Sequence, residues 1–164
     1  IFKDFKRQQS GKSLRISALP DASGAYIGQP VSYAAYTAET VIAEATAEAG
    51  IAIIGDDKNI IFASVKEGNI LLKEVKNGNT TILKTLPLSS TASAKIFPLK
   101  LKLKAQQNHY FTFSYALGNG AFNDVNTDPV DGGFLPPWDR ALRVGLTVLG
   151  GADQSAVFKS FSLR

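Results

Sequence analysis

Cysteine is absent from all 164 positions, which excludes disulfide bonds and any zinc site built on thiolates. No apolar run approaches the roughly 18 residues that cross a bilayer, so we expect a soluble chain with no membrane partner. Methionine is absent too, and the opening segment IFKDFKRQQSGKSL lacks the basic-then-apolar order of a signal peptide. Together with a length typical of one domain, this predicts that residues 1–164 are a single domain and a fragment of a larger protein.

Histidine occurs once, so a hydrolytic triad would depend on His109 as its base. No serine lies in a GxSxG context, and His109 follows Asn108 at the start of a predicted strand, which favours an exposed or capping histidine. Glycoside hydrolysis needs two carboxylates that face each other across a sugar. We predict no catalytic residues, because no spacing marks a pair among Glu39, Glu44, Glu48, Asp124, Asp128, Asp131, Asp139 and Asp153.

The surplus of positive charge is spread along the chain. A formal charge of +4 and a pI of about 9.3 could indicate an anionic partner. The densest basic stretch, KIFPLKLKLK over 95–104, alternates lysine with leucine, which places its lysines on one side of a strand. Because the aromatic and glycine residues of an RNA-binding sheet are missing, we predict a solvated strand face and no nucleic-acid partner.

Apolar and polar residues alternate with a period of two along most of the chain, as they do in β-strands. Turn signals such as KEGN (66–69) and KNGN (76–79) separate the alternating segments and supply the positive φ angles of tight hairpins. The pattern predicts an all-β fold of two stacked antiparallel sheets. The ten expected strands are 14–19, 33–45, 51–55, 60–66, 69–75, 80–86, 98–105, 110–117, 142–149 and 156–163.

One segment is ambiguous between helix and strand. TAETVIAEATAEAG, over 37–50, is rich in alanine and glutamate, which favour a helix. Its apolar residues do not recur at helical spacing, and the β-branched Val41 and Ile42 favour a strand. We therefore expect a long bent strand here.

The stretch 122–140 is the longest without periodicity, and such loops in compact domains are usually functional or cover a core. Asp124, Asn126, Asp128 and Asp131 lie within eight residues of each other in it. Because Ca²⁺ prefers loop carboxylates and carbonyls, Asp124, Asp128 and Asp131 are candidate metal ligands, and Ca²⁺ is the candidate cofactor. The alternative is that these residues form Asx turns and keep the loop soluble.

Sugar recognition requires aromatic rings that stack on pyranose faces and polar groups that bind hydroxyls. In PPWDR (136–140), Trp138 follows two prolines that fix its approach, and Arg140 stands just before a predicted strand. With Tyr33 and Tyr36, these residues form the candidate carbohydrate-binding site. The alternative is that Trp138 is a core residue held under a proline corner.

Five runs of sequence together resemble a known family: QPVSYAAYTAET, AGIAIIGDDKNIIFASV, GNILLKEVKNGNTTIL, LKLKLKAQQNHYFTFSYALG and RVGLTVLGGADQSAVFKSFSL. In this order they resemble the concanavalin A-like β-sandwich at the C-terminus of β-xylosidases and related arabinan-degrading glycoside hydrolases. The resemblance covers about residues 25–163. Where that family usually carries a D-G-x-x-W turn after its F-S strand, this chain has ALGNGAFNDV.

The resemblance implies a two-sheet, jelly-roll-like sandwich without catalytic residues, because in that family the catalytic acids lie on a separate propeller domain. It implies an accessory role, in which the domain stabilises a glycoside hydrolase or shapes its substrate pocket. The implied partners are that catalytic domain and an oligosaccharide or polysaccharide. Two alternatives remain open: a carbohydrate-binding module with its own site near PPWDR, and a stand-alone glycoside hydrolase.

Overall fold

The computed structural model describes residues 5–88, 95–136 and 142–164. Within these ranges the chain forms strands and no helix, and hence no helix long and apolar enough to cross a membrane. The strands are β1 (Arg7–Ser10), β2 (Ser13–Ser17), β3 (Ala25–Pro30), β4 (Tyr36–Ala45), β5 (Glu48–Asp56), β6 (Asn59–Lys66), β7 (Asn69–Lys76), β8 (Asn79–Pro87), β9 (Leu99–Gln106), β10 (Tyr110–Leu117), β11 (Asn123–Asp124), β12 (Val130–Asp131), β13 (Arg143–Leu149) and β14 (Ser155–Leu163).

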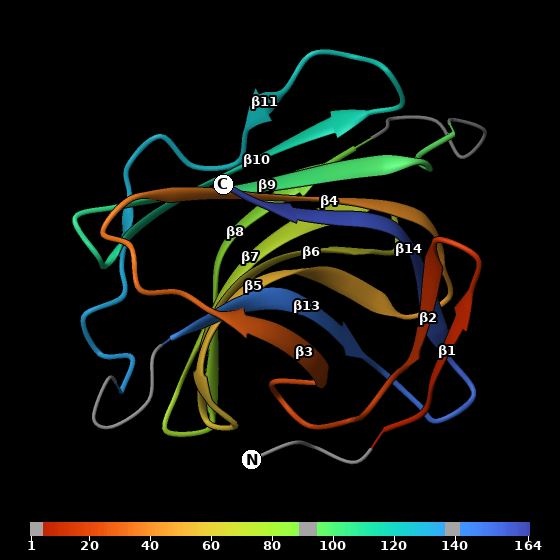
Figure 1. Cartoon of the computed structure of the whole chain (residues 1–164), viewed down its shortest axis with the longest axis horizontal. Helices are drawn as coiled ribbons and strands as arrows, with labels where there is room; N and C mark the ends of the chain where they lie inside the picture. Colours follow the sequence, from red (N-terminus) through yellow and green to blue (C-terminus); the bar gives the residue numbers. More distant parts are fainter. Residues whose placement is uncertain (1–4, 89–94, 137–141) are drawn as a thin grey trace.

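In the described residues, these strands form two antiparallel sheets that stack as two layers (Figure 1). One sheet has eight strands, in the order β1-β2-β14-β4-β9-β10-β11, with the short β12 also paired to β10. The other has six strands, in the order β3-β13-β5-β6-β7-β8. The predicted all-β sandwich of two antiparallel sheets is therefore confirmed.

Each of the ten predicted segments corresponds to a strand of the structure. The alternation pattern missed β1, β3, β11 and β12 for local reasons. β1 is the wholly exposed sequence RQQS, which has no apolar side to alternate with. β3 contains Gly28 and ends at Pro30, which is tolerated because β3 lies at a sheet edge. β11 and β12 have two residues each, too few to show a period.

The segment 37–50 is extended, as expected, but it is not one long bent strand. β4 ends at Ala45 and β5 begins at Glu48, and the two strands belong to different sheets. The chain crosses between the layers at Thr46 and Ala47, where no glycine, proline or asparagine marks a turn. The strand assignment was therefore correct, and the prediction of continuity was wrong.

The facing predicted for the basic strand is also confirmed. Leu99, Leu101 and Leu103 of β9 are fully buried between the sheets, and the alternate lysines point away from the core. The Lys102 ammonium lies 3.7 Å from the centroid of the Phe122 ring, a cation–π contact on the outer face.

The hydrophobic core fills the space between the two sheets. Its largest fully buried side chains come from both layers, including Phe111 and Phe113 of β10 and Ile51, Ile53 and Ile61 of β5 and β6. Because successive side chains of a strand point to opposite faces, each of these strands gives alternate residues to the core.

The outer face of the six-stranded sheet is apolar and buried as well. Six buried side chains form a second cluster there: Tyr26, Ala52, Ile54, Ile60, Phe62 and Val75. Thr147 Oγ1 donates a hydrogen bond to the carbonyl of Ser23, which ties the segment before β3 to this face. A charged side chain on this face is therefore removed from bulk water and needs a partner.

Candidate functional site

The predicted carbohydrate-binding residues do not form one surface in the described part of the chain. Tyr33 precedes β4 and has 69% of its surface exposed, whereas Tyr36 at the start of β4 is only 5% exposed and packs in the main core. The prediction of Tyr36 as a sugar-stacking ring is wrong, because no face of its ring is accessible. Trp138 and Arg140 lie outside the described residues.

Burial of Tyr36 also governs its phenol. Its hydroxyl is buried and has no hydrogen-bond partner among the described residues. Desolvation raises the pKa of Tyr36 above its ordinary value, because the ionised phenolate would be stranded among apolar side chains. This tyrosine is a core residue.

The predicted metal ligands are spread along β10 and do not converge. Asp124 pairs with Ser114 and Asp131 pairs with Tyr110, so their strand partners are four residues apart, or about 13 Å at 3.3 Å per residue. In the described ranges, no three histidine, cysteine, aspartate or glutamate residues could hold a metal ion. The described residues therefore give no support to Asp124, Asp128 and Asp131 as a calcium site, which stays a prediction.

The neighbouring Asn126 binds backbone groups of β10 and of its own loop. Its side-chain Oδ1 accepts a hydrogen bond from the backbone N–H of Phe113 at 2.8 Å. Its Nδ2 donates to the carbonyl oxygens of Phe111 at 3.2 Å and Asp128 at 2.9 Å. The amide thereby takes the place of a paired strand along β10, between β11 and β12.

His109 lies in the turn before β10, with its side chain 41% exposed. Its Nε2 is 3.9 Å from Asp131 Oδ1, and its ring is 4.3 Å from that of Tyr110. The carboxylate of Asp131 in turn accepts a hydrogen bond from the N–H of Gly133 at 2.9 Å. An exposed turn histidine, as the sequence indicated, fits these contacts.

The structure brings together a different set of polar residues, centred on a buried ion pair. Lys73 of β7 donates to both carboxylate oxygens of Glu48 at the start of β5, at 2.6 and 2.8 Å. The exposed fraction is 9% for Lys73 and 5% for Glu48. The Lys73 ammonium is also 5.6 Å from the centroid of the Phe62 ring. Sequence reasoning missed this pair.

The register explains how these two charges meet across three strands. Lys73 is opposite Phe62, and the row of Ser64 and Gly50 lies between it and the end of β5, where Glu48 stands. A Cβ on Gly50 would come within 2.0 Å of the carbonyl oxygen of Ala63, so only glycine fits at this position. Between Lys73 and Glu48, β5 therefore contributes Gly50, which has no side chain to separate the two charged groups.

A cavity of about 560 Å³ adjoins the ion pair, within the usual size range of small-molecule sites. Glu48 and Lys73 form part of its wall. The rest comes from the ends of several strands and the turns between them: residues 45–47, 65–68, 96–97 and 149–150, together with Pro20 and Gln154.

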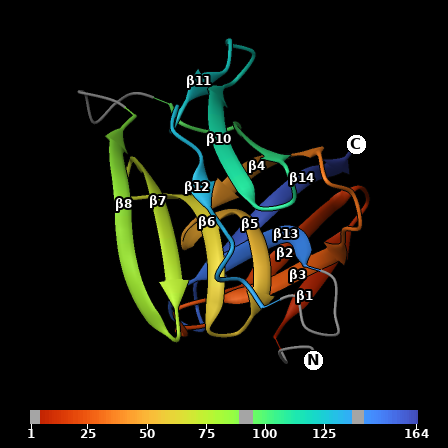
Figure 2. The same cartoon turned by 90° about the vertical axis from the view of Figure 1, so that its left-hand side faces the viewer.

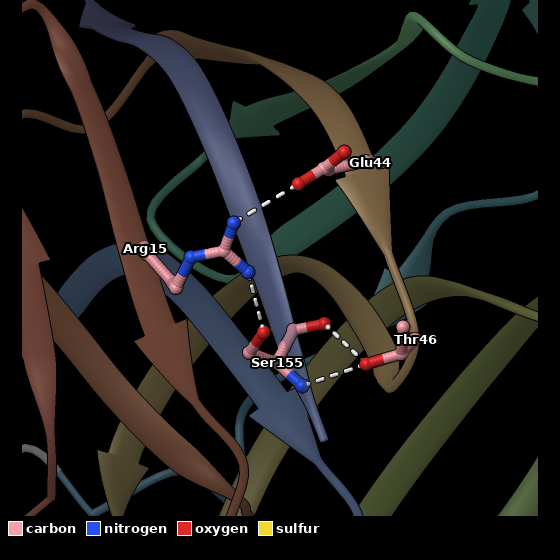
Figure 3. A network of polar contacts seen from close by, with 4 residues as sticks. All are labelled: Arg15, Glu44, Thr46 and Ser155. Atoms are coloured by element: carbon pink, nitrogen blue, oxygen red, sulfur yellow. Dashed lines mark hydrogen bonds and ion pairs between the residues drawn. The ribbon is translucent and has the colours of Figure 1, made fainter. Parts of the chain in front are cut away.

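Hydrogen bonds hold Thr46, one of the lining residues, against neighbouring strands (Figure 3). Arg15 of β2 donates to Glu44 at 3.0 Å and to Ser155 at 2.9 Å, and the N–H of Ser155 donates to the hydroxyl of Thr46 at 3.0 Å. The side-chain amide of Gln154 donates to the carbonyl of Thr46 at 3.2 Å. Two turns that line the cavity are therefore joined to each other and to the eight-stranded sheet.

No protein-family model matches the sequence, and neither does any curated protein compared with it. Solved structures do resemble the fold. The xylan β-1,4-xylosidase from Bacillus halodurans C-125 aligns with a TM-score of 0.75 and 15% identity, over 93% of this chain and 32% of that one. The GH43 BlXynB protein from Bacillus licheniformis aligns with a TM-score of 0.71 and 18% identity, over 92% of this chain and 32% of that one. The carbohydrate-binding module CBM66 from Bacillus subtilis aligns with a TM-score of 0.61 and 18% identity, over 98% of this chain and 92% of that one.

This chain has the concanavalin A-like β-sandwich fold. It spans about a third of the length of the first two structures and nearly all of the third. At sequence identities of 15% to 18%, the similarity to these structures establishes the fold alone.

Within the concanavalin A-like sandwich, one sequence signal pointed to the missed ion pair. Lys73 shares a strand face with Leu71 and Val75, which are both apolar and buried. A lysine between two buried apolar residues of one face requires a buried acceptor. The sequence around Lys73 could not predict which residue is that acceptor, because Glu48 reaches Lys73 only through the pairing of β5 with β6 and of β6 with β7.

Proposed function

We propose that this concanavalin A-like domain is a non-catalytic accessory domain of a carbohydrate-active enzyme, which it stabilises or whose substrate pocket it shapes. One observation carries the proposal. Over 93% of its length the chain matches about a third of a xylosidase chain, which means that the same sandwich occurs as one part of a larger sugar-processing protein. Its partner would be the catalytic domain of such an enzyme.

The open edge of the six-stranded sheet supports a contact of this kind. β8 is the edge strand, seen on the left in Figure 2. Ile82 and Leu83 of β8 are neighbours with exposed fractions of 55% and 42%, at a point where the pairing with β7 shifts register. Exposed large apolar side chains on a strand edge favour burial against another domain.

Deletion of residues 1–164 from the gene product that contains them tests the proposal. We expect the melting temperature of the remaining catalytic domain to fall by several degrees and its kcat/KM on aryl-glycosides to fall, because an interdomain contact is lost. Ile82→Ser with Leu83→Ser in the undeleted protein should reproduce part of the fall, and Lys84→Ser on the same strand is the matched control.

Two results would contradict the accessory role. The first is a deletion that changes neither the melting temperature nor kcat/KM. The second is hydrolysis of aryl-glycosides by the isolated 164-residue chain above the buffer rate, which would favour the stand-alone hydrolase.

A second candidate function is carbohydrate binding by the domain itself. It is favoured by the match to CBM66, because 92% of that carbohydrate-binding module is covered by this chain. The site proposed from the sequence keeps Trp138, Arg140 and the exposed Tyr33, and loses the buried Tyr36.

The binding function is tested by isothermal titration of the isolated chain with xylan, arabinan and glucan oligosaccharides. We expect micromolar to millimolar dissociation constants, with at least tenfold weaker binding in Trp138→Ala, because aromatic anchors dominate such sites. Phe122→Ala, which removes an aromatic ring on the eight-stranded sheet, is the control. Unchanged binding in Trp138→Ala would remove the PPWDR site from the proposal.

A further inference from the structure

The buried ion pair and the cavity beside it form a site that the accessory role does not use. Glu48 and Lys73 lie more than nine-tenths buried on the cavity wall, with their charged groups 2.6 Å apart. We propose that this cavity binds a neutral carbohydrate, such as a short oligosaccharide, through hydroxyl contacts to the Glu48–Lys73 pair. The proposal rests on the carbohydrate-binding candidate above and assigns it a site separate from PPWDR.

The charge of the wall selects a neutral ligand. Among the described lining residues, the charged groups are two lysines and two glutamates, because Lys66 and Glu67 accompany the buried pair. Their formal charges cancel. A phosphate or other anion would face Glu48 and Glu67, and a metal cation would face the ammonium groups. A sugar has no charge to be repelled by either.

The hydrogen-bonding capacity of the pair also matches hydroxyl groups. An ammonium has three donors and a carboxylate accepts about four hydrogen bonds. In the described part of the chain, Lys73 uses two donors, both on Glu48, and no other protein group is bonded to this carboxylate. Sugar hydroxyls donate and accept at once, so one ligand can bond to both members of the pair. Charge-assisted hydrogen bonds of this kind are stronger than neutral ones.

Part of the remaining wall is apolar, and two of its polar residues are held in place by hydrogen bonds. Ile96 and Phe97 precede β9, and Val65 and Leu149 lie at the ends of β6 and β13. Apolar and aromatic surfaces of this kind pack against the C–H faces of a pyranose. Since Thr46 and Gln154 are already cross-linked by these hydrogen bonds, the ligand does not have to order these turns.

The test is titration of the isolated chain with xylose, arabinose and glucose and their short oligosaccharides, followed by calorimetry and by backbone amide shifts in NMR spectra. The test variant is Glu48→Gln with Lys73→Met, which removes both charges together and leaves no buried charge unpaired. The control is Glu74→Gln with Lys76→Met. This pair consists of the same residue types on the same strand, 3.4 Å apart, and does not line the cavity.

We expect at least tenfold weaker binding in the cavity variant, unchanged binding in the control, and ligand-induced shifts at Glu67 and Gly68 on the cavity rim. Three results would overturn the inference. If the cavity variant binds as the wild type does, the cavity is not the site, although carbohydrate binding stands. If Trp138→Ala alone abolishes binding, the site lies at PPWDR. If the folded wild-type chain binds none of the sugars at millimolar concentration, both the cavity site and the binding function fall, while the accessory role is decided by the deletion experiment.

Discussion

Replacement of Lys73 by methionine is expected to lower the free energy of unfolding by about 3–5 kcal/mol, the usual cost of removing one partner of a buried ion pair. Methionine fills much of the volume of the lysine stem, so the loss is electrostatic. Glu48, which is 5% exposed in the wild-type structure, would lose the ammonium that now bonds to both of its carboxylate oxygens, on a sheet face lined by apolar residues. Urea denaturation at neutral pH measures the loss.

The double variant Glu48→Gln with Lys73→Met shows whether Lys73→Met destabilises the domain through an unpaired charge or through a packing defect. Because it contains no buried charge, we expect it to recover most of the stability that Lys73→Met loses. The exposed pair of Arg15 and Glu44 is the comparison, since its side chains are 47% and 65% exposed and surface ion pairs contribute little. If Lys73→Met costs no more than Glu44→Gln does, the Glu48 carboxylate is solvated, and the account of this sheet face is wrong.

The fold could be predicted because its determinants are local. Alternation assigns each residue of a strand to one of two faces, and this was enough to place Leu99, Leu101 and Leu103 inside and the lysines of β9 outside. The crossing between β4 and β5 was invisible for the same reason. Its residues Thr46 and Ala47 continue the composition of the strands and are held by distant partners, such as the Ser155 carbonyl that accepts from both N–H groups.

The candidate site depended on contacts that the sequence does not encode locally. Tyr36 could have been assigned to the core, because it shares its face of β4 with Ala38 and Ile42, which are both fully buried. Glu48 and Lys73 could not have been paired, because they are 25 residues apart and meet across β6. Composition identified residue types suited to sugars and cations, and the sheet pairing decided which of them meet.

The loop from 122 to 136 shows the same distinction between residue type and role. Carboxylates and an amide within a few residues predicted a calcium site, yet the amide of Asn126 bonds to backbone groups of β10. The N–H of Val125 also donates to the carbonyl of Phe113 at 2.8 Å. This loop therefore satisfies both the N–H and the carbonyl of Phe113. The side chains of Phe111 and Phe113, which are fully buried, are thereby held in the core.

Asn126→Ala should accordingly destabilise the domain by about 3 kcal/mol, because it breaks three hydrogen bonds and leaves the buried N–H of Phe113 and carbonyl of Phe111 without this partner. Asn126→Asp keeps the size and the acceptor for Phe113, but it replaces the donor with an oxygen that faces two carbonyls. We expect a loss of similar size at neutral pH, which a missing side-chain volume could not explain.

Asn123→Ala is the matched control, since the Asn123 amide makes one exposed hydrogen bond, to the carbonyl of Ala121 at 3.3 Å. Its expected effect is within about 0.5 kcal/mol, as for most surface substitutions. Amide hydrogen exchange gives a second measurement: Phe113 should lose protection in Asn126→Ala, which removes its acceptor, and keep it in Asn123→Ala. Intact protection of Phe113 in Asn126→Ala would mean that another group replaces the amide and that the loop does not depend on this asparagine.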